Sequence, residues 1–143
     1  MTTKHNDALL NIGIYGGAFD PPHRAHVNLA EAALAQFKFD ELHVIPTGDA
    51  VHKRRHLTPA VHRIAMAKLA FTGVAKTTID EREVNRGGAS YTIDTLLELR
   101  TAYPKAKFTV IVGQDQLMAF QTWHRYEEIL KMATLAVVVR GGG

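Results

Sequence analysis

Strand-like and helix-like stretches alternate along the whole chain, and this alternation limits the available folds more than any other feature of the sequence. Stretches typical of strands lie at 9–15, 41–47, 76–84, 107–113 and 134–140. Helical periodicity occurs at 22–38, 58–71 and 92–102, and residues 114–133 fit one or two further helices. Such an order is typical of a parallel sheet with right-handed crossovers and helices on both faces. The sequence therefore predicts a doubly wound α/β fold.

Residues that end or start elements are consistent with this order. Pro46 ends the second strand, and Thr58 followed by Pro59 is typical of a helix start. No repeat, low-complexity tract or linker interrupts the 143 residues, so we expect a single domain over 1–143. No helical pattern follows the last strand, so we expect the C-terminal portion of the architecture to be incomplete.

The composition excludes several classes of protein. The chain has no cysteine, which excludes disulfides and thiolate metal sites. No apolar run approaches the roughly 20 residues that span a bilayer, and no secretory signal pattern opens the chain. We therefore expect a cytoplasmic protein with no membrane partner. The formal charge of +3 is compatible with anionic ligands such as nucleotide phosphates.

A cluster of basic residues, HKRRH, lies at 52–56. Single-stranded nucleic-acid surfaces interleave aromatic residues with basic ones, and no aromatic residue interleaves with this cluster. The cluster therefore indicates a mobile basic loop over a nucleotide pocket, and we expect no nucleic-acid partner.

The stretch GGAFDPPHRAH at 16–26 carries the strongest functional signal. It follows a predicted strand and opens a predicted helix, which is where ligands bind in open parallel sheets. Gly16 and Gly17 permit a tight turn and a close approach of the backbone to a ligand, and the free N–H groups of a helix start suit a phosphate. His23 and His26 are three residues apart and so share a face of the first helical turn.

Three interpretations of this stretch stay open. The combination of glycines, Asp20 and paired histidines favours a phosphate site. Taken singly, either histidine fits a helix cap or a surface position. A zinc site could use His23 and His26 with a third ligand from 52–56, but its cationic neighbours would repel a metal ion.

The same stretch resembles the G-G-[ST]-F-D-P-x-H-x-G-H signature of the nucleotidyltransferase superfamily. Further segments at 52–53, 82–100, 110–130 and 137–140 look like bacterial nicotinate mononucleotide adenylyltransferases, so the resemblance covers nearly the whole chain. The segment RGGASYTIDTL at 86–96 discriminates most, because pantetheine-phosphate adenylyltransferases and cytidylyltransferases share only the first signature. The resemblance implies a Rossmann-like sheet. It also implies a step of NAD biosynthesis, in which nicotinate mononucleotide attacks ATP to give nicotinate adenine dinucleotide and pyrophosphate.

The resemblance also implies roles for the matching residues. His23, His26 and Lys53 would bind the triphosphate and stabilise the charge that develops during transfer. The residues expected at the ATP phosphates and ribose are Gly16, Gly17, Ala18, Phe19 and Asp115. The residues expected at the nicotinate ring and its carboxylate are Ser90, Tyr91, Thr92 and Trp123. Trp123 alone would equally fit the core, Ser90 and Asp115 equally fit helix N-caps, and we expect solvated surface positions for Arg63 and Arg86.

The expected cofactor is Mg²⁺, held by substrate phosphates and water without a protein metal ligand. The expected partners are ATP and nicotinate mononucleotide, with a homo-oligomer left open. Ala18 stands where the family has serine or threonine, and Ala25 stands where it has glycine. Nothing after Arg140 matches the family segment I-S-S-T-x-I-R, so we expect weak or absent activity from this polypeptide. Two alternatives stay open: a nucleotidyltransferase with another phosphate substrate, and a catalytically weakened nucleotide-binding domain.

Overall fold

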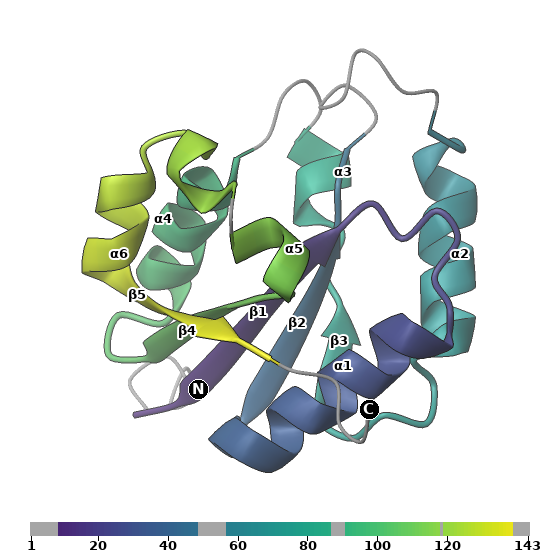
Figure 1. The fold of residues 1–143 in the computed structure, drawn as a ribbon, viewed down its shortest axis with the longest axis horizontal. Coiled ribbons are helices and arrows are strands. Elements are labelled where there is room, and N and C mark those ends of the chain that lie inside the picture. The colour runs from purple at the N-terminus through teal and green to yellow at the C-terminus, as the bar shows by residue number, and fades with distance from the viewer. Residues whose placement is uncertain (1–8, 49–56, 87–90, 118, 139–143) are drawn as a thin grey trace.

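The computed structural model describes residues 9–48, 57–86, 91–117 and 119–138 of the chain. These residues form one parallel sheet in the strand order β3-β2-β1-β4-β5. The strands are β1 (Asn11–Gly17), β2 (Glu41–Pro46), β3 (Thr77–Ile79), β4 (Lys107–Val112) and β5 (Ala133–Val137). The chain moves from β1 to β3 on one side and then to β4 and β5 on the other, so the strand order reverses at β1 (Figure 1). Such a switch point is where open α/β sheets bind ligands.

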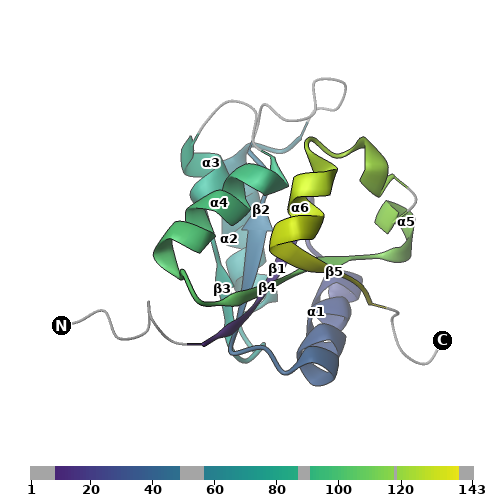
Figure 2. The same ribbon diagram turned by 90° about the vertical axis from the view of Figure 1, so that its left-hand side faces the viewer.

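Helices cover both faces of this sheet. The helical segments among the described residues are α1 (Arg24–Phe37), α2 (Ala60–Ala70), α3 (Arg82–Arg86), α4 (Thr92–Ala102), α5 (Gln114–Leu117), the 3₁₀ turn η2 (Phe120–Thr122) and α6 (Tyr126–Met132). In Figure 1, α4 and α6 lie on one side of the strands and α1 and α2 on the other. When the view is turned by 90°, α4 and α6 lie together in front of the sheet (Figure 2). The predicted Rossmann-like, doubly wound fold is confirmed.

Each face of the sheet has its own apolar core because side chains alternate along every strand. Leu29 and Ala33 of α1 and Ala67 of α2 pack against one face. On the other face, Leu96 of α4 and Ile129 of α6 pack against the strands. The strand residues that meet them are Tyr15, Leu42, Val44 and Ile111 on the first face and Ile12, Ile14, Ile45 and Val110 on the second. Among the described residues, no helix is long and apolar enough to cross a membrane.

Two of the differences between predicted and observed element boundaries bear on the site. The first strand continues through Gly16 and Gly17, which pair with Ile45 and Pro46 of β2, so the turn begins only at Ala18. The third strand ends at Ile79, where a strand over 76–84 was predicted. The backbone N–H of Arg82 donates to Oδ1 of Asp80 at 3.1 Å, and this side-chain contact starts α3 instead of prolonging the strand.

Candidate active site

Two cavities meet at the carboxyl end of β1. The first, of about 690 Å³, is lined by the His23–His26 pair, and the second, of about 470 Å³, is lined by Trp123 and Tyr91. Their shared wall consists of Gly16, Gly17, Ala18 and Gln116. Gln116 is carried by α5, which contacts β4, the strand next to β1 in the sheet (Figure 1). Because one wall serves both cavities, ligands bound in the two would approach each other over the glycines.

His23 and His26 hold each other in place at the start of α1. Nδ1 of His23, the N-cap residue, accepts from the backbone N–H of Ala25 at 3.2 Å. Nδ1 of His26 accepts from the backbone N–H of His23 at 3.0 Å, and the ring centroids are 4.1 Å apart. Because both Nδ1 atoms accept, each ring in its neutral form carries its proton on Nε2. The same imidazoles therefore cap the helix and line the first cavity.

This capping corrects one expectation from the sequence. The backbone N–H of Ala25 donates to Nδ1 of His23. The backbone N–H groups of His26 and Val27 both donate to the carbonyl oxygen of His23. They are therefore not the free donors that a phosphate at a helix start would use. The imidazole rings of His23 and His26 line the first cavity beside these N–H groups.

The turn after β1 depends on Phe19. Its backbone has a φ of 50°, in the left-handed region that residues other than glycine seldom adopt. Its buried ring packs edge-on against Tyr15 and Phe71, and edge-on against His26 with centroids 5.1 Å apart. Such packing holds a backbone conformation that would otherwise be disfavoured. Phe19 therefore fixes the turn and one of the two imidazoles.

Arg63 ties this turn to β2 and α2, although a solvated surface position was predicted for it. Its side chain is fully buried, at 0% exposure. Nη1 donates to the carbonyl oxygens of Ala18 at 3.0 Å and Thr47 at 2.9 Å, and Nε donates to that of Thr58 at 2.6 Å. The carbonyl groups that accept these bonds compensate for the burial of the charge. The surface prediction is wrong because these acceptors come from three separate segments.

The second cavity has an aromatic side. Trp123 packs against Phe120 with ring centroids 5.0 Å apart, and the rings of Tyr91 and His124 lie 4.4 Å apart. Thr92 is the first residue of α4, and its N-cap, Tyr91, makes no side-chain capping bond. The Thr47 hydroxyl oxygen is buried at this cavity without a hydrogen-bond partner in the described part of the chain. The cavity therefore combines flat apolar surfaces with polar groups.

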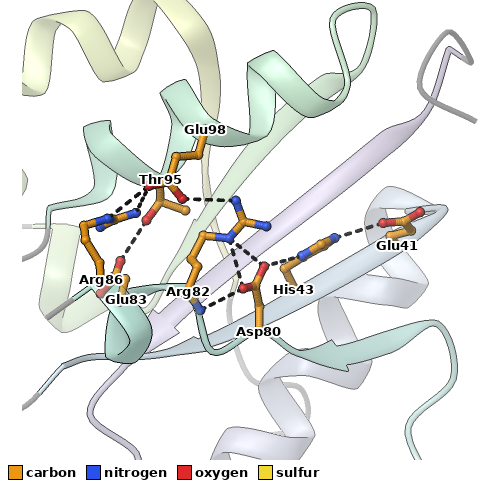
Figure 3. Close-up of polar contacts among 8 residues, drawn as sticks. All are labelled: Glu41, His43, Asp80, Arg82, Glu83, Arg86, Thr95 and Glu98. Atoms are coloured by element: carbon orange, nitrogen blue, oxygen red, sulfur yellow. Dashed lines mark hydrogen bonds and ion pairs between the residues drawn. The ribbon is translucent and has the colours of Figure 1, made fainter. Parts of the chain in front are cut away.

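Glu83 brings a carboxyl group to this second cavity. It is 8% exposed, and its Oε2 accepts from the hydroxyl of Thr95 at 3.0 Å (Figure 3). Burial raises the pKa of Glu83, and this effect outweighs the hydrogen bond from Thr95, which lowers it. The pattern of the sequence did not indicate Glu83, because residues 76–84 were predicted to form a strand.

A polar network outside the cavities holds α3 in place. The ring of His43 on β2 lies between Oδ2 of Asp80 at 2.8 Å and Oε1 of Glu41 at 2.9 Å (Figure 3). Arg82 contacts both Asp80 and Glu98 of α4, and Nη2 of Arg86 lies 2.8 Å from Oε2 of Glu98. The network joins β2, α3 and α4. Arg86 thus has a fixed ion pair in place of the solvated surface position that was predicted.

The charges of this network depend on one another. Burial acts to lower the pKa of His43, but the hydrogen bonds to Asp80 and Glu41 outweigh it and raise the pKa. Burial acts to raise the pKa of Asp80, but the hydrogen bonds from His43 and Arg82 hold it well below its usual range. The two carboxylates therefore favour the protonated form of His43.

We expect the stability that His43 contributes to depend on pH. Its folded-state pKa lies above the unfolded value of about 6.5. The contribution is therefore complete below about pH 6.5 and is lost as the pH rises through the folded-state pKa. Urea unfolding of the wild type and His43→Asn from about pH 5.5 to about pH 9 measures it. The difference in unfolding free energy should shrink as the pH rises, and a constant difference would contradict the ion-paired state.

The structure brings most of the predicted site residues together. Those that line the first cavity, the second or both are Gly16, Gly17, Ala18, Phe19, His23, His26, Tyr91, Thr92 and Trp123. Asp115 lies in α5, next to Gln116. Lys53, the basic cluster at 52–56 and Ser90 lie outside the described residues. Residues that the sequence did not indicate, but that line a cavity or hold its wall, are Thr47, Arg63, Glu83, Thr95, Gln116 and His124.

The chain is similar to known proteins in both sequence and fold. A family model described as cytidylyltransferase-like matches residues 14–141. A protein of Albidiferax ferrireducens named "Probable nicotinate-nucleotide adenylyltransferase" is 52% identical over 129 residues, which are 90% of this chain and 65% of that protein. One of the same name from Oceanobacillus iheyensis is 40% identical over 92% of this chain and 69% of its own length.

The chain spans less than two thirds of the length of several such relatives. It covers 62% of the length of the protein of that name from Methylibium petroleiphilum. Among solved structures, the chain resembles Plasmodium falciparum nicotinic acid mononucleotide adenylyltransferase complexed with NaAD. The TM-score is 0.75 at 21% identity, and the match covers 90% of this chain and 74% of that one. This likeness concerns the fold.

Proposed function

Because the chain belongs to the cytidylyltransferase-like family, we propose that it transfers the adenylyl group of ATP to nicotinate mononucleotide, a step of NAD biosynthesis. The products are nicotinate adenine dinucleotide and pyrophosphate. The observation that carries the proposal is the wall of Gly16, Gly17, Ala18 and Gln116 that two differently lined cavities share. The names of the similar proteins from Albidiferax and Oceanobacillus support the choice of acceptor.

The first cavity is proposed to hold the triphosphate. The acceptor's phosphate oxygen forms a bond to the α-phosphorus of ATP, and the bond from that phosphorus to the leaving pyrophosphate oxygen breaks. The acceptor is itself the nucleophile, so the protein contributes positioning and charge stabilisation. The Nε2–H groups of His23 and His26 are the proposed donors to the phosphate oxygens, because each Nδ1 accepts from the backbone.

The second cavity is proposed to hold the nicotinate half of the acceptor. Trp123 offers a flat aromatic face, and the start of α4 at Thr92 offers backbone N–H groups to the ring carboxylate. Gly16 and Gly17 lie between the two cavities. Without side chains there, the acceptor phosphate can reach the α-phosphate over the end of β1.

Magnesium is proposed to arrive with the triphosphate. The described residues contain no group of three or more His, Cys, Asp or Glu side chains that could hold a metal ion. Oδ2 of Asp20, beside the first cavity, accepts from the backbone N–H of Thr58 at 2.8 Å. The described residues thus do not make a protein cage for Mg²⁺, and phosphate oxygens and water would be its ligands. When bound, the ion neutralises charge on the leaving pyrophosphate.

A single-turnover assay tests the proposal. The protein is mixed in excess with radiolabelled ATP, Mg²⁺ and nicotinate mononucleotide, and the dinucleotide and pyrophosphate are separated and counted. We expect both products in equal amounts, and less product when nicotinamide mononucleotide replaces the acid. Hydrolysis of ATP without dinucleotide, or faster transfer to an acceptor that lacks the pyridine ring, would refute the proposed reaction.

Gly16→Val is expected to block both cavities without unfolding the protein. A Cβ atom at Gly16 would meet the carbonyl oxygen of Ile45 at an ordinary 3.8 Å, so the fold accommodates it, and Gly16 lines both cavities, so we expect the added methyl groups to take up space that ligands need. We expect nucleotide affinity to fall about 10-fold or more, with unfolding free energy changed by less than about 1 kcal/mol. Quenching of Trp123, the single tryptophan of the chain, measures binding.

Gly73→Val is the matched control for this substitution. A Cβ atom at Gly73 meets nothing within 4 Å, and Gly73 lines neither cavity. This variant should bind nucleotides as the wild type does. Unchanged binding by Gly16→Val would show that ligands do not use the shared wall.

A further inference from the structure

The second cavity is proposed to receive a pyridine ring that carries a carboxylate. Among the described residues that line this cavity, His124 is the one whose side chain can carry a positive charge. The other proposed partner of the carboxylate is the start of α4, whose backbone N–H groups offer only a partial positive charge. A charged imidazole at this cavity would therefore favour an acid over the uncharged amide of nearly the same shape.

The position of His124 fits such a role. It directly follows Trp123, which offers the proposed aromatic face for the ring, and it precedes α6. Its imidazole contacts the ring of Tyr91, the N-cap residue of α4, with centroids 4.4 Å apart and ring planes 31° apart. Tyr91 lines the same cavity. The imidazole therefore lies on the side of the cavity where α4 begins.

The acidic neighbour of His124 has a stronger partner. Glu128 of α6 binds the guanidinium of Arg125, whose Nε donates to Oε1 and whose Nη2 donates to Oε2 at 2.6 Å. The hydrogen bond from Arg125 is the largest cause that lowers the pKa of Glu128, and the charge of His124 is a smaller one. Glu128 therefore compensates Arg125 first, and the charge of His124 can act on a ligand.

We infer that His124 is a specificity-determining residue, whose protonated imidazole favours a pyridine ring with a carboxylate over a ring with an amide. The inference rests on the proposed function and deepens it, since it names the residue that distinguishes the acid. Backbone N–H groups at the start of α4 keep their polarity at every pH, whereas imidazole side chains lose their charge between about pH 5 and 8. The preference for the acid should therefore be larger at acidic pH.

Calorimetric titration with nicotinate mononucleotide and nicotinamide mononucleotide, at about pH 5.5 and about pH 8.5, tests this inference. The two ligands have the same ribose and phosphate, so titration of the phosphate cancels in the ratio of their affinities. We expect this ratio of acid to amide in the wild type to fall about threefold or more between the two pH values. His124→Phe keeps a ring against Tyr91 without a charge, and its ratio should match the alkaline wild-type value at both pH values.

Two further variants serve as controls. In His124→Arg the guanidinium stays charged over this range and can stack on an aromatic ring, so the ratio should stay high at both pH values. His62 is exposed on α2 and lines neither cavity. His62→Phe should therefore retain the wild-type dependence of the ratio on pH.

Other ionisable groups surround His124 and its neighbour Arg125, namely Glu83, Tyr91, Asp94 and Glu128. Among these, Glu83 could produce a similar trend, because burial raises its pKa and its ionisation would repel an acid as the pH rises. That effect would persist without the imidazole. A ratio that still falls with pH in His124→Phe would therefore overturn the assignment to His124.

Each remaining outcome also decides a claim. A wild-type ratio that does not change with pH, or a wild-type ratio at acidic pH in His124→Phe, would overturn the inference, even if the protein makes dinucleotide. Wild-type protein that shows the expected ratios but makes no dinucleotide would uphold the inference and refute the proposed reaction. Wild-type protein that binds neither mononucleotide would refute both.

Discussion

Replacing His26 by alanine is expected to slow adenylyl transfer about 100-fold or more. The proposed reaction builds negative charge on phosphate oxygens, and a donor fixed in advance at such a position is typically worth about 10²–10³ in rate. His26 is fixed by its Nδ1, which accepts from the backbone of His23, and by the ring of Phe19. His23→Ala should have a comparable effect. Single-turnover rates at saturating nucleotide measure both.

His23 needs a second variant because it is also the N-cap of α1. Loss of an N-cap side chain costs about 1 kcal/mol of stability, which could itself disturb the site. His23→Asn keeps an acceptor for the helix but removes the imidazole. We expect His23→Asn to unfold at the wild-type urea concentration and yet to transfer as slowly as His23→Ala. Wild-type rates in His23→Asn would leave capping as the sole role of this histidine.

Replacing Arg63 by leucine is expected to destabilise the protein by about 3–5 kcal/mol, the usual cost of breaking a buried charged contact. The substitution leaves the carbonyl groups of Ala18, Thr47 and Thr58 without the guanidinium. Domains of this size are stable by only about 5–15 kcal/mol, so the variant should lie near its unfolding transition. The urea midpoint should fall steeply, and nucleotide binding at the turn should fall with it.

Two control substitutions define the role of the hydrogen bonds that the Arg63 guanidinium donates. Arg63→Lys retains the charge but lacks the planar set of donors, so it should recover only part of the lost stability. Arg24→Leu removes a positive charge from an exposed position at the start of α1 and should change the unfolding free energy by less than about 0.5 kcal/mol. An unchanged urea midpoint for Arg63→Leu would show that these bonds do not hold the turn.

The sheet and its helices could be predicted because their signals are local. The alternation of strand and helix patterns implies a parallel sheet, and the glycines and histidines around the end of the first strand indicate the edge where such sheets bind ligands. His23 and His26 line the first cavity and Trp123 lines the neighbouring second cavity, and their functional roles stay predictions. Trp123 is half-buried, and it both packs against the core on the face of α4 and α6 and lines the second cavity.

The positions of Arg63 and Glu83 could not be predicted in the same way, because they depend on contacts between segments that are distant in the sequence. Arg63 lies on the buried stripe of α2 with Ala60, Ile64 and Ala67, so its spacing did indicate the interior. Its charge favoured a surface position. The burial of this charge is possible because carbonyl groups of three other segments accept hydrogen bonds from it, and the sequence pattern does not indicate these contacts. Glu83 was not predicted for a different reason. Its helix, α3, begins where the side chain of Asp80 accepts a hydrogen bond from the backbone, and the periodicity of the sequence does not indicate such a contact.

A crystal structure with bound nicotinate adenine dinucleotide tests the central claim most directly, because the proposed reaction requires its product to span both cavities at once. We expect its pyrophosphate over Gly16 and Gly17 within hydrogen-bonding distance of His23 or His26, with the pyridine ring against Trp123 and beside Glu83. A product bound elsewhere, or one whose phosphates lie away from the histidines, would contradict the account.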